Sequence, residues 1–297
     1  MKYEKPALTF DEQADLLIQR GLLSDREELL GRLRSVSYYR LSGYWYPFRR
    51  PDDTFGPGTT LDAIWRRYTF DRRFRLVVLE AIERVEVCIR TELVYLLAHA
   101  QGPFGYLDPA SLPGLSSDRY TVFLEQLETE CSRSREQFLN HFRQKYGDDH
   151  PHPPYWMVTE LMTFGALLTL FRGSPSNVKK QIASRFGTTD RVFNSWLGAL
   201  NGVRNICAHH GRLWNRELGY KPMIPTGDVR WHDPVHVANN RVFGVLTILK
   251  YLLSNITPDT HWPARLSELL AEYPEIPLAS MGFPGDWQLC PFWADSD

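Results

Sequence analysis

The sequence has few cysteines, no long apolar run and almost no net charge, and each shortage excludes a class of protein. Its four cysteines are scattered with no C-x-x-C pair, so we expect neither a disulfide framework nor a cysteine-rich zinc site, and we expect a reducing compartment. No stretch approaches the roughly 18–20 apolar residues of a membrane span, and the N-terminus has no apolar signal core. We therefore expect a cytoplasmic protein with no membrane partner.

Charge and short motifs exclude further classes. The net charge is −1 over 297 residues, so attraction to a polyanion must come from local clusters. There is no G-x-S-x-G nucleophile elbow and no Walker-type phosphate loop. Cys207 and His209 stand two apart on a predicted helix and point in nearly opposite directions, which excludes a Cys–His dyad within that helix.

Apolar residues recur mainly at helical spacing, and strand alternation is rare. The longest periodic stretch covers 61–98, and TFDE at 9–12 and SDRE at 24–27 fit capping boxes. The segment 36–50 is aromatic-rich and contains Gly and Pro, which predicts a loop with a short extended piece. Other helices are predicted over these ranges: 118–145, 155–171, 175–186, 189–214, 235–255 and 263–272. The sequence predicts an all-α protein with an N-terminal helical and aromatic region (1–50), a helical domain (51–275) and a C-terminal tail (276–297).

The stretch VRNICAHHGRLWNR at 203–216 concentrates cationic and polar residues in an otherwise apolar helical pattern. At about 100° per residue, Arg204, Asn205 and His209 fall on one polar arc, together with Arg212 and Arg216. No acidic residue lies between 201 and 216, so these cations are not paired within the helix. Guanidinium, carboxamide and imidazole groups together can grip a phosphate, although a solvated polar face remains the simpler alternative.

The other histidines favour packing over chemistry. His210 falls on the apolar arc, which predicts a buried, hydrogen-bonded side chain; if the helix ends at Gly211, His210 could instead enter the cleft. His232 and His236 have i, i+4 spacing, but Pro234 between them breaks the helix that would align them. His150 and His152 lie in a Pro-rich loop. We therefore expect no metal site and no cofactor.

A second cationic region runs from residue 32 to 90, with twelve arginines, no lysine and seven acidic residues. Arginines interleaved with aromatic rings are typical of surfaces that contact phosphates and stack RNA bases. The candidate RNA-contacting residues there are Arg40, Tyr44, Trp45, Arg72 and Arg73. Internal ion pairing is an equally supported interpretation, because Glu80–Arg84 and Glu86–Arg90 have i, i+4 spacing.

Four motifs in this order resemble the Abi-like proteins (the AbiD/AbiF group) of bacterial abortive infection. They are YYRLSGYWYPF (38–48), FDRRFR (70–75), GPFGYLDP (102–109) and GVRNICAHHGRLWNR (202–216). That family is similar to the all-helical HEPN superfamily, whose hallmark is an arginine followed four to six residues later by a histidine, here Arg204 and His209, with a polar residue, here Asn205, often directly after the arginine. The resemblance implies a HEPN-like helical bundle with an N-terminal extension.

The same resemblance implies an antiviral toxin: a metal-independent endoribonuclease in which two motifs, usually from two protomers, form one site. It implies Arg204, Asn205 and His209 as catalytic residues, an RNA substrate, a homodimer and pairing with a small noncoding RNA as antitoxin or guide. Two other functions remain open. One is a non-catalytic RNA-binding HEPN module, and the other is a protein-interaction subunit that uses the aromatic segment 38–48.

Overall fold

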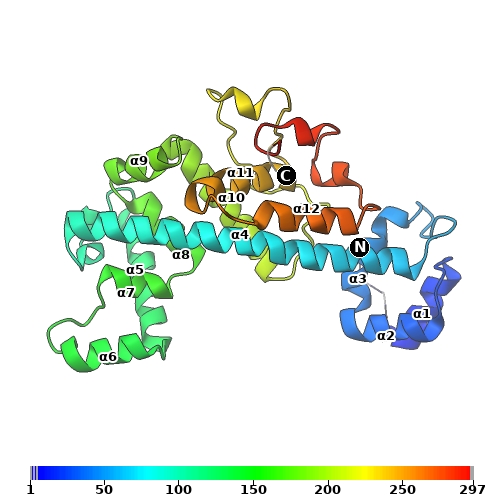
Figure 1. Ribbon diagram of the computed structural model, residues 1–297. Coiled ribbons are helices and arrows are strands. Elements are labelled where there is room, and N and C mark those ends of the chain that lie inside the picture. Colours follow the sequence, from blue (N-terminus) through cyan, green and yellow to red (C-terminus); the bar gives the residue numbers. More distant parts are fainter. Residues whose placement is uncertain (1, 3, 5, 295–297) are drawn as a thin grey trace. The chain divides into compact units, whose positions relative to one another are not determined.

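The computed structural model describes residues 2, 4 and 6–294, and within them the chain is all-α, as predicted (Figure 1). Within these residues, β pairing is limited to two isolated bridges. The chain divides into two compact units: residues up to 76 with 265–277, and residues 77–264 with 278 onward. The first unit thus continues past residue 50, where the sequence predicted a boundary. The predicted tail also needs correction, because Trp293 is buried and its Nε1 donates to Thr247 Oγ1 at 3.0 Å.

The first unit begins with two capped helices. Helix α1 (Phe10–Gln19) has the predicted capping box, in which Thr9 and Glu12 satisfy each other's free backbone N–H groups. Helix α2 (Arg26–Val36) is capped by Asp25, whose side chain accepts from the Glu28 N–H at 2.9 Å. The predicted box beginning at Ser24 is therefore one residue out of register, because the aspartate carboxylate takes the capping role.

Helix α3 (Tyr38–Trp45) replaces the loop predicted for this segment. Its buried residues Leu41, Tyr44 and Trp45 are spaced i, i+3, i+4, which is the period of a helix face. Ser37 caps it by accepting from the Arg40 N–H. The aromatic content suggested extended structure, but burial of one helical face determines the outcome.

Helix α4 (Leu61–Gln101) is the long helix that the periodicity predicted, and it contributes residues to both units. Its core positions follow at steps of three and four residues, with Val78, Ile82, Val85 and Ile89 all fully buried in the second unit. The first unit also contains most of α12 (Trp262–Glu272).

The second unit contains the helices that carry the candidate site. Two predicted helices are each divided in the structure: 118–145 into α5 (Ser117–Arg133) and α6 (Gln137–Tyr146), and 155–171 into α7 (Tyr155–Val158) and α8 (Phe164–Gly173). Each break is a turn with extended residues, at Ser134 and at Met162. Next come α9 (Ser176–Arg185), α10 (Asp190–Ala208) and α11 (Val242–Ile256), and α8, α9 and α11 pack on α10.

The GPFGYLDP motif at 102–109 fixes the loop between α4 and α5. The buried Tyr106 donates its hydroxyl to the Pro153 carbonyl at 2.6 Å, and the Tyr155 N–H donates to the Pro103 carbonyl at 2.8 Å. Gly105 approaches Gln101 so closely that a Cβ would lie 2.5 Å from the Gln101 Cβ. The motif therefore has a packing role that ties the loop to the start of α7.

Candidate functional site

Helix α10 presents one buried and one polar face. Thr189 caps it by accepting from the Val192 N–H at 3.3 Å. Its inner face buries Phe193, Trp196 and Leu200 almost completely. This apolar face holds the helix in the second unit and leaves the opposite side, including Arg204 and Asn205, facing outward.

The C-terminal end of α10 is a Schellman motif. The helix ends at Ala208 with His209 as its C-cap, earlier than the predicted residue 214. The His210 N–H donates to the Cys207 carbonyl at 3.0 Å and the Gly211 N–H to the Ile206 carbonyl at 2.7 Å. The left-handed residue of this motif is usually glycine, but here it is His210, with a φ of +57°.

The three predicted catalytic residues lie together at this helix end. Arg204 is half-buried, whereas Asn205 and His209 are exposed. The Arg204 guanidinium lies 3.5 Å from the Asn205 Oδ1, to which it donates. The end of α10 therefore presents a guanidinium, a carboxamide and an imidazole within two helical turns.

His210 is exposed, which corrects the prediction that it packs into the core. The prediction assumed that the helix continues, whereas the left-handed turn at His210 rotates this residue off the helix face. The chain re-enters the core only at Leu213 and Trp214, both buried. The two adjacent histidines are thus both accessible from solvent.

Arg212 and Arg216 follow in the loop after the helix. Arg212 is half-buried and Arg216 is exposed. A Cβ built on Gly211 would lie 3.6 Å from the Arg216 Nη1, so this guanidinium folds back over the capping turn. A helix C-terminus carries partial negative charge that repels anions, and the capping N–H groups together with these arginines offset that charge.

The candidate RNA-contacting residues of the first unit have different surroundings. Tyr44 and Trp45 are 2% and 1% exposed, so they cannot stack on a base and that prediction is wrong. Arg73 pairs with Glu272, which favours the internal ion-pairing interpretation for this residue. Arg40 and Arg72 are exposed.

Tyr44 belongs instead to a buried network that sequence reasoning missed. Its hydroxyl donates to the Asp71 carboxylate at 2.7 Å, and Asp71 pairs with Arg75 on the next turn of α4. Burial, followed by the neighbouring Asp71 charge, raises the pKa of Tyr44 well above its usual range. The i, i+4 spacing of Asp71 and Arg75 was the available signal.

Neither a metal cluster nor a membrane span occurs in the described part of the chain. No three His, Cys, Asp or Glu side chains among residues 2, 4 and 6–294 are grouped closely enough to hold a metal ion. His232 and His236 stack with ring centroids 5.7 Å apart, and His150 stacks on Phe104. None of the described helices is both long enough and apolar enough to cross a bilayer.

Comparison with known protein families gives a match. A family model described as Abi-like protein matches residues 31–215, which is more than half of the chain. The match includes α3, α4, α8, α10 and the capping turn after α10. No curated protein and no solved structure matches.

Proposed function

This chain belongs to the Abi-like protein family, and on that premise we propose that it acts in bacterial abortive-infection defence as a metal-independent endoribonuclease of HEPN type. The observation that carries the proposal is the group formed by the half-buried Arg204 and the exposed Asn205 and His209 at the end of α10. These residues have the arginine, polar residue and histidine pattern of the HEPN hallmark, on a helix that presents them outward.

The proposed reaction is an internal transfer at one phosphodiester. The RNA 2′-oxygen attacks the adjacent phosphorus while its proton passes to a base, and the bond from phosphorus to the 5′-oxygen breaks as that oxygen takes a proton. The products are a 2′,3′-cyclic phosphate and a 5′-hydroxyl. Histidine is the side chain that most often transfers protons in catalysis, so we assign one of these transfers to His209, and Arg204 stabilises charge on the non-bridging oxygens.

The helix end presents one histidine on the arc of Arg204, whereas the reaction uses both an acid and a base. A homodimer that joins two α10 ends across a two-fold axis supplies the second imidazole. If each site needs both copies of His209, a dimer that contains one inactive protomer has no activity. Wild-type protein mixed with excess His209→Ala protein should therefore lose activity as the square of the wild-type fraction, and a linear loss would contradict a shared site.

Cleavage assays test the endoribonuclease itself. We expect cutting of RNA in EDTA, no cutting where the 2′-hydroxyl at the cut site is replaced by hydrogen, and products that end in a cyclic phosphate. Arg204→Ala and His209→Ala should abolish cutting, whereas His141→Ala, an exposed histidine on α6, should not. Loss of cutting in EDTA would contradict the metal-free mechanism.

The alternative is a non-catalytic RNA-binding module that binds RNA at the same cationic helix end but does not cleave it. It predicts RNA affinity that falls with salt and a cellular phenotype that His209→Ala leaves unchanged. Sequencing the RNA bound to His209→Ala protein identifies the substrate and any small noncoding RNA partner in one experiment. An empty result would contradict both RNA functions.

A further inference from the structure

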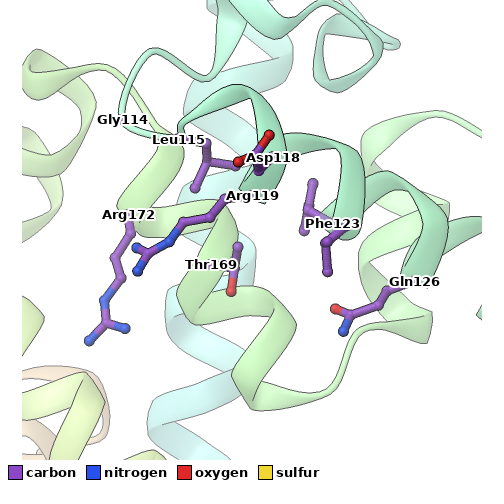
Figure 2. Close-up of a pocket in the computed structure, with 9 residues that line it drawn as sticks. Gly114, Leu115, Asp118, Arg119, Phe123, Gln126, Thr169 and Arg172 are labelled. Carbon is purple, nitrogen blue, oxygen red and sulfur yellow. The ribbon is translucent and has the colours of Figure 1, made fainter.

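A pocket of about 420 Å³ opens between α5 and α8 in the second unit (Figure 2). Leu115 and Arg119 line it at the start of α5, Phe123 and Gln126 lie one and two turns later, and Thr169 comes from α8. None of these residues belongs to the end of α10 or to the hallmark motif.

Two glycines bring the pocket walls together. The Gly114 N–H donates to the Gly173 carbonyl at 2.9 Å, and a Cβ on Gly114 would collide with the Arg172 carbonyl oxygen. A Cβ on Gly173 would lie 2.9 Å from the Leu115 Cγ. This close backbone approach places Arg172, at the end of α8, beside the first turn of α5.

Two arginines make this pocket cationic on one side. Figure 2 shows Arg119 and Arg172 extending toward the same side, whereas the Asp118 carboxylate lies beside Leu115 at the start of α5. Within the described part of the chain neither guanidinium has a carboxylate partner, and Arg172 donates its Nε only to the Asn194 Oδ1 at 2.9 Å. Guanidinium groups on the same side of a pocket are well suited to bind a phosphate.

The remaining walls suit a base. Leu115 and the exposed Val122 supply an apolar surface, and Gln126 adds an amide that can donate to and accept from a base edge. The volume is within the range of small-molecule sites. The pocket therefore combines cationic, amide and apolar groups, which is the composition of a nucleotide site.

The pocket is connected to the candidate active site by the polar face of α10. At steps of three and four residues this face carries Arg191, Asn194, Gly198, Asn201, Asn205 and His209. A Cβ on Gly198 would lie 3.3 Å from the Arg172 Nη2 and 3.0 Å from the half-exposed ring of Tyr220. Gly198 and His209 are eleven residues apart, about 16 Å along the helix, which a few nucleotides of single-stranded RNA can bridge.

The loop that carries Tyr220 is fixed against α10. The Met223 N–H donates to the Ser195 Oγ at 2.9 Å, and the Trp196 Nε1 donates to the Met223 carbonyl at 2.8 Å. The Leu218 N–H donates to the Asn240 carbonyl at 2.9 Å. Tyr220 is thus held beside Arg172, where its ring can stack on a base between the pocket and the helix end.

We propose that the α5–α8 pocket binds a nucleotide of the RNA strand, with its phosphate between Arg119 and Arg172, several nucleotides from the phosphate that is cut. The strand then follows the polar face of α10 past Tyr220 to His209. This inference rests on the proposed function for the position of the cut, but the binding itself requires no cleavage. The proposal predicts that cutting depends on the length of the RNA and on the nucleotide that the pocket binds.

Binding of labelled RNA oligonucleotides of increasing length to His209→Ala protein, followed by fluorescence anisotropy, tests this pocket. Arg119→Ala should weaken binding of the longer oligonucleotides by about tenfold and leave a dinucleotide unaffected, because only longer strands reach the pocket. The slope of affinity against salt should also decrease, since one phosphate contact is lost. Gln126→Trp, which fills the pocket without changing charge, should cause the same length-dependent loss.

Arg135→Ala, an exposed arginine between α5 and α6, is the matched control. Equal affinities of Arg119→Ala and Arg135→Ala for every oligonucleotide would overturn the proposal. Adenosine monophosphate that binds as tightly as the long oligonucleotide would overturn the assignment to a strand in favour of a free nucleotide. Length-dependent loss of binding, together with wild-type protein that does not cut RNA, would support the pocket while contradicting the endoribonuclease.

Discussion

Replacing Asp71 by asparagine tests the buried ion pair of the first unit. Asp71 is fully buried and Arg75 is 4% exposed, so water cannot solvate the arginine once its partner has lost its charge. Removing one member of a buried pair typically costs about 3–5 kcal/mol of the free energy of unfolding. Asparagine retains an oxygen that can accept from the Tyr44 hydroxyl, so we attribute the loss to the missing charge. We expect the free energy of unfolding to fall by about 3 kcal/mol.

Urea unfolding measures this loss, with tryptophan fluorescence as the local probe, because Trp45 lies in the same unit and packs edge-on against Tyr38. Glu92→Gln breaks the more exposed pair with Arg185 and should cost at most about 1 kcal/mol. Asp71→Asn combined with Arg75→Met removes both charges, so its loss should be at least about 2 kcal/mol smaller than the sum of the single losses. A loss in Asp71→Asn no larger than that in Glu92→Gln would refute the reasoning.

Three further predictions concern caps and pH. His210→Gly should be more stable than His210→Ala by about 1 kcal/mol in thermal unfolding, because only glycine adopts the left-handed backbone without strain, and both variants should cut RNA if His209 is the catalytic histidine. Thr9→Ala should cost about 1 kcal/mol in urea unfolding through loss of the α1 cap, and an unchanged midpoint would contradict it. Burial raises the pKa of Tyr106 and of Tyr155, so the folded state keeps protons that the unfolded state releases above about pH 10, and stability measured by alkaline unfolding should fall above that pH.

The long helices could be predicted from the sequence because their burial is periodic. Core residues of α4 recur every three or four positions from Phe70 to Leu97, a signal that few other structures produce. The failures occurred where a short segment depends on its surroundings. Helix α3 contains Tyr44 and Trp45, residue types that favour strands but that are buried here on one face of a helix. The sequence after its N-cap, Ser37, has no capping-box pattern that would mark the start of the helix.

The candidate site was predicted in part for the same reason. Arg204, Asn205 and His209 share a helical arc, so their placement followed from spacing alone. The residue at which α10 ends could not be predicted in this way. The residue with the left-handed backbone is His210, whereas the glycine that usually takes this conformation stands one position later, at Gly211. The pocket between α5 and α8 gave no signal, since Arg119 and Arg172 are brought together only by the tertiary packing of two distant segments.

Gly198 shows how a gain in stability can conflict with access to a surface. Glycine in a helix interior costs about 1 kcal/mol relative to alanine, so selection for thermal tolerance alone would favour Gly198→Ala. The added methyl would displace the Tyr220 ring and crowd the Arg172 guanidinium. In a library of variants at position 198, selection for thermal stability should therefore enrich alanine. A second selection for RNA binding should remove the alanine variants.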